Sequence, residues 1–488
     1  MFIIFCISLV IGAILFRNFG FSIFEVSLCG ALLGALFVLY FKSRKSLVLA
    51  LAVFASVSLG AMRLWLVPVQ DIEFGSRAFT GTVRSVDERL DRELLTIRVD
   101  QESFDIQATL YKQTNLSVGD RVAVRGNIEK AEDFVTETGR TFDYDGYLES
   151  KGVEAVMRNP QIKLLEEGKF SFVKMATNIR KSLAETLAHF VRFPVDGVVA
   201  GMLVGFQGGI PKYLSDIFRD TGTLHTLVLS GYNITVLVGF LGIVFRRMPF
   251  RLKTLAIGAG IFTLVLVSGA GVAAVRAGIM GGIALFAGMT LQSYQALRAL
   301  FVSMLFFFFV NPQTIFVDPG LHLSFLATFF IITILPIIKN KFFFDEEGTK
   351  AWKKTLLETV ILAVGLPIFM LPYLMYFSGL FPLFSPVANI VLVPIIPILM
   401  FGGLVVVATS FVPFLPNIFG AVISFVGMLS IKVLGFLALL PKWQTPPVGG
   451  WSVLLVYLFL FLIIFRKDIK LYFAHIRNIF TKTVNTRK

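Results

Sequence analysis

The chain has 488 residues, of which 56% are hydrophobic and only 16% are charged, with a formal net charge of +14. Apolar runs of about 18 or more residues recur along it, which is typical of transmembrane helices and excludes a water-soluble protein with one ordinary core. The two cysteines, Cys6 and Cys29, both lie in apolar runs, so no disulfide framework is expected.

The charge is divided unevenly between two parts of the chain. Residues 72–168 hold 13 basic and 19 acidic side chains, a net charge of −6, so the remainder carries +20. The positive-inside rule explains a basic membrane part without nucleic-acid binding. The four histidines are far apart in the sequence, and no GxxxxGK[ST] motif occurs. We therefore expect no metal, no cofactor and no ATP site.

The N-terminal region, residues 1–68, is expected to form transmembrane helices. Its apolar runs lie at 2–16, 21–41 and 46–67. The basic residues Lys42, Arg44 and Lys45 separate the second run from the third. Because short basic loops stay in the cytoplasm, the third run leads outward and residues 72–168 are extracytoplasmic.

Residues 69–168 have the composition of a small soluble β-domain inserted between membrane segments. Strands are expected at Phe79–Val86, Leu94–Val99, Phe104–Tyr111, Arg121–Ile128 and Val153–Arg158. About five short strands favour a small all-β, OB-like barrel. The acidic balance argues against direct DNA binding by this domain, which needs a positive groove, and favours a structural or gating role.

Residues 169–193 are predicted to form an amphipathic helix on the membrane surface. Its apolar face comprises Phe172, Ala176, Ile179, Leu183, Leu187 and Phe190, and its basic face comprises Lys174, Arg180, Lys181 and Arg192. The next apolar stretch, 195–206, is too short to span a bilayer, and glycines and Pro211 end it.

Residues 194–466 are expected to form the main transmembrane domain, followed by a basic cytoplasmic tail at 467–488. The apolar runs lie at 222–245, 254–269, 271–290, 296–316, 320–338, 355–378, 385–411, 417–440 and 450–465. Together with the N-terminal runs they predict about 12 spans. Placing the strongest basic segments inside puts both termini in the cytoplasm. Ser268 to Gly271 forms either a tight turn or a break within a re-entrant pair.

The run that begins at Gly222 carries polar residues where lipid-facing side chains would be expected. On one continuous helix, His225 and Asn233 would lie about 12 Å apart along the axis, close to the face of Ser230. Polar side chains in a membrane usually face a bundle interior or a watery path. The alternative is that Ser230 and Asn233 form interhelical hydrogen bonds and Gly231 is a close-packing site.

Three more polar residues lie near the outer ends of their expected spans. An unpaired arginine inside a span costs at least about 2.5 kcal/mol, so Arg276 is expected to be paired or hydrated, with snorkelling to the surface as the alternative. Asp318 is expected to cap the helix that begins at Pro319, with His322 one turn further on. With His225, these residues predict a shared outer vestibule.

Five segments carry motifs that follow one another in the order seen in a known family. They are Gly222–Asn233, with a Gly-Thr pair and a histidine before a Ser-Gly core, the Arg-Ala segment Val275–Met280, the Asp-Pro-Gly segment Asp318–Ala327, the Pro-Val-Ala-Asn segment Ser385–Pro394, and Phe142–Leu148. Together they resemble the ComEC competence proteins over most of the chain, from about residue 20 to 440. The last segment matches the end of the family's extracytoplasmic domain, which is OB-like.

Three positions depart from the family pattern. Asn233 stands where the family has a second signature histidine, His322 where it has a glutamine, and Val272 where it has a proline. Chemistry that needs an imidazole at position 233 is therefore not expected, whereas a polar lining role is. The HxHxDH motif of the family's metallo-β-lactamase-like domain does not occur. We expect a short form, whose nuclease step comes from another protein.

The resemblance implies a channel in the bacterial cytoplasmic membrane that carries single-stranded DNA inward during natural transformation. The path would be lined, without catalytic residues, by His225, Ser230, Gly231, Asn233, Arg276, Asp318 and His322. Expected partners are single-stranded DNA, the lipid bilayer, and a separate DNA receptor, nuclease and cytoplasmic motor or single-strand-binding proteins. The alternatives are a small-solute or lipid transporter and a membrane hydrolase that uses Ser230 and His225.

Overall fold

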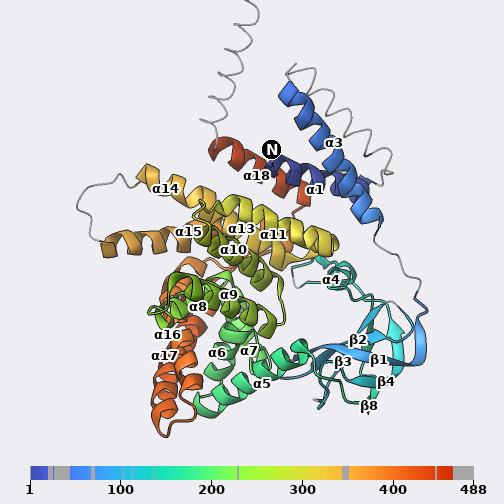
Figure 1. Cartoon of the computed structure of the whole chain (residues 1–488), viewed down its shortest axis with the longest axis vertical. Helices are drawn as coiled ribbons and strands as arrows, with labels where there is room; N and C mark the ends of the chain where they lie inside the picture. Colours follow the sequence, from blue (N-terminus) through green and yellow to red (C-terminus); the bar gives the residue numbers. More distant parts are fainter. Residues whose placement is uncertain are drawn as a thin grey trace, which may run out of the picture.

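The computed structural model describes residues 2–19, 26, 44–66, 72–102, 104–112, 114–136, 138–227, 230–342, 351–445 and 448–464. Within them, a β-domain lies beside a much larger helical region (Figure 1). The predicted second N-terminal run, apart from Val26, lies outside the described residues, as do Cys29 and the tail at 467–488.

The β-domain is a small barrel. Its strands are β1 (Gly75–Glu88), β2 (Glu93–Val99), β3 (Asp105–Leu110), β4 (Arg121–Glu129) and β7 (Ala155–Arg158). They follow the order β1-β2-β3-β7-β4, and β4 pairs back to β1, which closes the sheet. β3 and β7 are parallel, whereas the other neighbours are antiparallel. Buried and half-buried positions alternate along β2, so inward residues such as Ile97, Ile106 and Val122 fill the barrel.

Each of the five strands expected from the sequence overlaps one of these strands. The structure adds β8 (Gln161–Glu166), which pairs with β4. It also adds a hairpin of β5 (Phe134–Val135) and β6 (Thr141–Phe142), followed by helix α4 (Tyr144–Ser150). Asp143 caps α4 by accepting a hydrogen bond from the amide of Gly146 at 2.7 Å. Figure 1 shows α4 between the barrel and the helical region.

Helix α4 is bound to the short helix α12 (Gln313–Val317). The side-chain amide of Asn311 donates to the carbonyl oxygens of Glu149 at 2.8 Å and Ser150 at 3.0 Å. The hydroxyl of Thr314 donates to the same Ser150 carbonyl at 3.1 Å. These bonds to the last carbonyls of α4 fix the β-domain to the membrane part.

Arg140 makes a second junction from the β5–β6 hairpin to the end of α15 (Ala351–Phe377). Its guanidinium donates to the carbonyl oxygens of Met375 at 2.6 Å, Tyr376 at 3.1 Å and Thr445 at 3.1 Å. Arg140 is only 7% exposed although it belongs to the soluble domain. A cation at a helix C-terminus also interacts favourably with the helix dipole.

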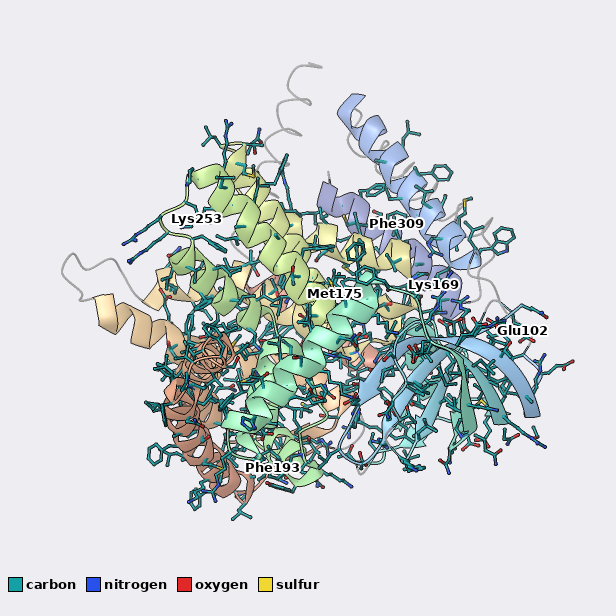
Figure 2. The ribbon with its side chains drawn as sticks, turned by 60° about the horizontal axis from the view of Figure 1, so that its bottom comes forward. Glu102, Lys169, Met175, Phe193, Lys253 and Phe309 are labelled. Carbon is teal, nitrogen blue, oxygen red and sulfur yellow. The ribbon has the colours of Figure 1, made fainter. Side chains whose placement is uncertain are left out.

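Helix α5 (Phe172–Phe190) lies within residues 169–193, where the sequence predicts an amphipathic helix. Its basic face contacts the barrel: Lys174 pairs with Asp120 at 3.3 Å, and Arg180 donates to the carbonyl of Val86 at 2.9 Å. Figure 2 shows α5 leaving the barrel near Lys169 and Met175 and running toward Phe193. Part of the basic face of α5 therefore contacts the β-domain. A position of α5 on the membrane surface stays a prediction.

The described residues contain seven helices that are long and apolar enough to cross a membrane. These spans are Leu224–Val244 (a short 3₁₀ turn followed by an α-helix), Phe250–Val267, Val272–Met289, Pro319–Asn340, Leu357–Phe377, Ser385–Ala408 and Leu415–Ala438. Shorter apolar helices lie at Leu51–Trp65, Val195–Val204, Ala296–Val310 and Gly450–Leu460. The chain is therefore a multi-pass membrane protein with a β-domain, and the total of about 12 spans stays a prediction.

The helices run in the following order. They are α1 (Phe2–Phe19), α3 (Arg44–Trp65), α6 (Val195–Val204), α7 (Lys212–Asp220), η1 (Leu224–Thr226), α8 (Gly231–Val244), α9 (Phe250–Val267), α10 (Val272–Met289), α11 (Ala296–Val310), α13 (Pro319–Phe329), the π-helical η2 (Phe330–Ile334), α14 (Leu335–Phe342), α16 (Ser385–Ala408), α17 (Leu415–Ala438) and α18 (Gly450–Ile464). The largest core cluster joins α5 and α6 to α16 and α17, around fully buried residues such as Leu187 and Met202. Ser268 to Gly271 forms a turn between α9 and α10, with Gly269 at a φ of 78°.

Candidate functional site

Arg276 lies in the second turn of α10, inside the helical bundle, and is 6% exposed. Its Nε donates to the hydroxyl of Ser324 at 2.8 Å, and its Nη1 donates to the hydroxyl of Thr328. Ser324 and Thr328 are four residues apart and therefore share one face of α13. The Thr328 hydroxyl donates its own proton to the Ser324 carbonyl at 2.8 Å, which leaves its lone pairs for the guanidinium.

All the hydrogen-bond partners of Arg276 among the described residues are neutral, and the third is the sulfur of Met280. The remaining nitrogen, Nη2, lies against Gly231 at the start of α8, where a Cβ would be 3.0 Å away. Buried charges in proteins are normally paired with an opposite charge. In the described chain, Arg276 is therefore a buried cation without a carboxylate partner.

Gly222 to Asn233 is not one continuous helix, which corrects the expected polar stripe. Gly222 has a φ of 70°, η1 follows it, and α8 starts only after Ser230. The Ser230 hydroxyl caps α8 by accepting from the Asn233 amide at 3.3 Å, and it donates to Asn233 Oδ1 at 3.1 Å. The 12 Å spacing along one axis therefore does not apply.

Asn233 joins two helices. It is fully buried, and its Nδ2 donates to the carbonyl of Met202, in the last turn of α6, at 3.0 Å. The open C-terminal turn of α6 thus gains a donor from the first turn of α8. The Asn233 bond is of the interhelical kind that the packing alternative describes, whereas the Ser230 hydroxyl bonds to Asn233 at the start of the same helix.

Asp318 and His322 hold the start of α13. Asp318 is buried and accepts from the Leu321 amide at 3.0 Å, which confirms the predicted N-cap. His322 Nε2 contacts the carbonyl of Ile315 at 2.6 Å and must donate there, so in the neutral ring Nδ1 accepts from the hydroxyl of Tyr373 at 2.8 Å. His322 therefore ties α12 to α15, and no hydrogen bond joins it to Arg276 among the described residues.

Arg276 and Asp318 lie at the end of the bundle that faces the β-domain. Asp318 directly follows α12, which binds α4. The turn before α10 contains Gly269, whose Cβ position lies 3.2 Å from Nη1 of Arg180, the residue that also binds β1. The shared vestibule with His225 stays a prediction, since no ion pair joins Arg276 to Asp318 among the described residues and His225 lies on the separate turn η1.

Two residues that organise this end of the molecule escape the sequence prediction. Arg140 lies in a Thr-Gly-Arg turn, and Tyr373 is one of two tyrosines in the apolar helix α15. The hydroxyl of Tyr373 is a polar group in an apolar span, and this is the signal by which the sequence could have identified the residue. Arg140 offered none, because its partners are backbone carbonyls far along the chain. Among the described residues, no group of three His, Cys, Asp or Glu side chains is placed to hold a metal.

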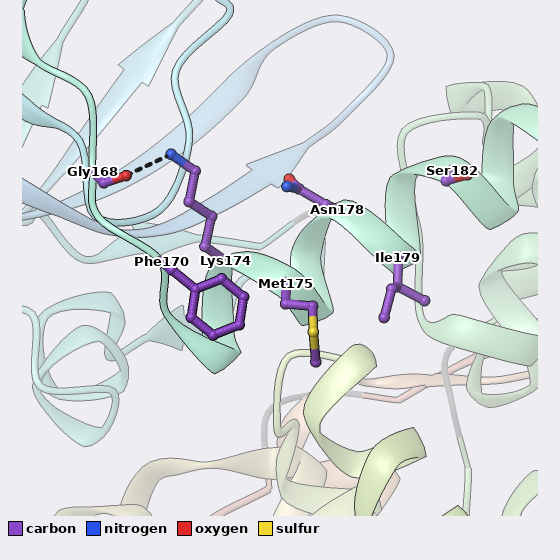
Figure 3. Close-up of a pocket in the computed structure, with 7 residues that line it drawn as sticks. All are labelled: Gly168, Phe170, Lys174, Met175, Asn178, Ile179 and Ser182. Carbon is purple, nitrogen blue, oxygen red and sulfur yellow. Dashed lines mark hydrogen bonds between the residues drawn. The ribbon is translucent and has the colours of Figure 1, made fainter.

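The surface of α5 carries a shallow depression of about 450 Å³ next to the barrel. In Figure 3, Phe170, Met175 and Ile179 lie on one side of the helix, while Lys174 turns the other way to donate to the carbonyl of Gly168 at 3.0 Å. The one charged group that lines it is thus already paired with the barrel. The depression has no set of reactive side chains and lies apart from Arg276.

The family model described as "Competence protein" matches residues 202–470, which contain every candidate residue from His225 to His322. The chain belongs to the Competence protein family. This match confirms the resemblance expected from the sequence motifs. The matched region of this competence-family protein begins in α6 and includes α8, α10 and α13.

One curated relative is the ComE operon protein 3 of Bacillus subtilis (strain 168), which is 22% identical over 255 residues. The alignment covers 52% of this chain and 31% of that relative, so the chain aligns with about a third of the relative's length. No solved structure matches.

Proposed function

We propose that this protein is a channel in the bacterial cytoplasmic membrane that carries single-stranded DNA into the cell during natural transformation. Membership of the competence family and the multiple apolar helices support this function. The observation that carries the proposal is Arg276, a buried cation that only neutral groups hold. DNA carries dense negative charge, so its path through a membrane needs a locally positive, polar lining.

The candidate residues divide between lining and support. Arg276 supplies positive charge, with Gly231 beside it and His225 and Asp318 near the outer ends of their segments. Asn233 and His322 hold the helices around this region through their hydrogen bonds to backbone carbonyls. No ATP-binding motif occurs in the sequence, so the driving force comes from a separate motor or single-strand-binding protein, and a separate receptor and nuclease supply the strand.

The β-domain is an OB-like domain on the outer side of the membrane, and both termini are cytoplasmic. The closed strand order β1-β2-β3-β7-β4, with β3 and β7 parallel, supports this class of five-stranded barrel. The chain crosses the membrane about 12 times. This total counts the seven long helices, the shorter apolar helices and apolar segments outside the described residues.

The hydrolase alternative needs Ser230 and His225 to act as nucleophile and base. In the structure the Ser230 hydroxyl is paired with Asn233, and it serves as the cap of α8. A catalytic serine needs its base within hydrogen-bond reach. The geometry therefore favours the channel over the hydrolase, and a transporter for small solutes or lipids remains the second candidate because of the broken helices.

A transformation assay tests the proposal. Deletion of the gene is expected to abolish the entry of labelled single-stranded DNA into the cytoplasm while DNA still binds the cell surface. Arg276→Gln is expected to reduce transformation at least tenfold at equal protein levels in the membrane. Arg298→Gln is the matched control, because Arg298 is exposed on α11. Normal DNA entry in the deletion strain would sink the channel function.

A further inference from the structure

The connection between α8 and α9 concentrates positive charge at one end of the bundle. Arg246 and Arg247 lie in the turn after α8, and Arg251 and Lys253 lie in the first turn of α9. The three arginines are exposed and Lys253 is half-buried. Residues 221–317 contain no Asp or Glu, and none of the four cations forms an ion pair among the described residues. These four residues, the basic segment, therefore lack a counter-charge in the described protein.

The basic segment lies at the end of the bundle opposite to the β-domain. Helix α9 runs from it to the turn at Gly269, which lies against Arg180, a residue that binds β1. The 18 residues of α9 extend about 27 Å, close to the roughly 30 Å of a hydrocarbon core. Figure 2 shows Lys253 at the edge of the bundle far from the barrel, on which Glu102 is labelled. The basic segment thus lies at the level of the lipid headgroups on the membrane face away from the β-domain.

Exposed apolar side chains lie among these cations and continue along the span. Phe250 and Leu252, which flank Arg251, are 61% and 57% exposed. Leu252 shares one face of α9 with Leu255 and Phe262, which are 59% and 66% exposed. In a membrane, an apolar face of this kind is covered by acyl chains. Because that face is continuous with Phe250 and Leu252, the bilayer around α9 reaches the basic segment.

We propose that the basic segment is a binding site for the phosphate headgroups of anionic phospholipids. Arginine forks match phosphate oxygens, and basic residues next to a membrane helix attract anionic lipids. The positive-inside rule accounts for a basic loop on one side of the membrane, but it requires neither exposed apolar neighbours nor a preference among lipids.

A phospholipid fits this surface better than a DNA strand does. Both carry phosphate, but only the lipid has an acyl chain that covers Phe250 and Leu252 while its headgroup meets Arg251. The site does not depend on the proposed function, because it concerns the surface of α9 and not a path through the bundle.

The test uses the purified full chain reconstituted in phosphatidylcholine bilayers. Electron spin resonance measures how strongly the protein immobilises spin-labelled phosphatidylglycerol relative to spin-labelled phosphatidylcholine. The wild type is expected to prefer phosphatidylglycerol at least about threefold, since each basic residue near the surface adds to the attraction. Salt at about 1 M is expected to remove most of this preference, because the Debye length falls to about 3 Å.

The glutamine variant combines Arg246→Gln, Arg247→Gln, Arg251→Gln and Lys253→Gln, and it is expected to lose most of the preference. The matched control removes the same charge from exposed positions of the β-domain and its linker, and it is expected to keep the preference; it combines Lys112→Gln, Arg125→Gln, Lys163→Gln and Lys169→Gln. An equal preference in the wild type and the glutamine variant would overturn the site.

A charge-preserving variant and a DNA arm complete the test. Arg246→Lys, Arg247→Lys and Arg251→Lys together keep the charge, so this variant is expected to retain most of the preference even if the glutamine variant fails to fold. A fluorescent thymidine oligonucleotide is then added to the wild type and the glutamine variant in phosphatidylcholine bilayers. Weaker oligonucleotide binding by the glutamine variant, with an unchanged lipid preference, would assign the basic segment to DNA and refute the lipid site.

Discussion

Nη2 of Arg140 donates to the carbonyl oxygen of Met375 at 2.6 Å, across 235 residues of sequence. The bond places a charged side chain of the β-domain at the C-terminal end of the membrane helix α15. The same helix carries Tyr373, which binds His322 of α13. The β-domain is thus connected through α15 to the helix whose hydroxyls hold Arg276.

Arg140→Ala is expected to destabilise the protein by roughly 1–3 kcal/mol, because it leaves the carbonyls of Met375, Tyr376 and Thr445 without this donor. Thermal unfolding of the purified protein measures the loss. Arg77→Ala is the control: Arg77 is paired with Glu102 on the surface of the same domain, and its loss is expected to cost less than about 1 kcal/mol. Equal effects of the two variants would contradict the junction.

Gly379→Ala is expected to be strongly destabilising in the wild type and much less so in the Arg140→Ala background. A Cβ at position 379 would overlap the Arg140 guanidinium, and the φ of 68° there disfavours a side chain by itself. Without Arg140, only the backbone cost of about 1–2 kcal/mol remains. A double-mutant cycle of unfolding free energies checks this coupling, and simple additivity would argue against direct contact.

Asn233→Ala is expected to destabilise the protein by roughly 1–3 kcal/mol through the unpaired carbonyl of Met202. Asn233→His is expected to retain more stability, because a ring N–H can supply the same donor. Thermal unfolding and transformation should therefore fall together across these variants. Loss of transformation at full stability in Asn233→Ala would instead indicate direct contact with the strand.

His322→Gln is expected to be tolerated, whereas His322→Leu is expected to cost roughly 1–3 kcal/mol. Glutamine has a donor for the carbonyl of Ile315 and an acceptor for the hydroxyl of Tyr373, and leucine has neither. The unfolding midpoints of both variants measure the difference. A glutamine variant as unstable as the leucine variant would show that the ring itself is needed.

The anchor between α5 and the barrel is expected to weaken in acid. Burial opposes ionisation of Asp120, but hydrogen bonds from the amides of Gly168 and Ser117 and from Lys174 outweigh it and lower its pKa below the ordinary 3.8. A carboxyl whose pKa is lower in the folded state stabilises the protein above pH 3.8, and this stabilisation fades as the pH falls through the folded pKa.

Unfolding of the wild type and of Asp120→Asn between pH 6 and pH 3 tests this expectation. The variant lacks the charge, so its stability is expected to be lower at pH 6 and to fall less steeply below about pH 4. Parallel curves for the two proteins would show that Asp120 contributes nothing to the acid sensitivity.

The local features of this protein were predictable because each depends on neighbours in the sequence. Alternating apolar residues predicted the strands β1, β2, β3, β4 and β7, and long apolar runs predicted the membrane helices. The cap by Asp318 is also local, since the aspartate and the Leu321 amide are three residues apart. The prediction of an unbroken helix from His225 to Asn233 was wrong. Ser230 has an extended backbone, and its hydroxyl accepts a hydrogen bond from the Asn233 amide, so a new helix begins after it.

The sequence by itself determined a multi-pass membrane protein of the competence family with an inserted β-domain, since hydropathy, alternation and motifs are properties of the chain order. Only the tertiary structure decided what the polar residues bind. Asn233, His322 and Arg140 each meet a backbone carbonyl, and Arg276 meets hydroxyls 48 and 52 residues away. Every residue carries a carbonyl, so no residue type marks these partners in the sequence, and the packing of the helices selects them.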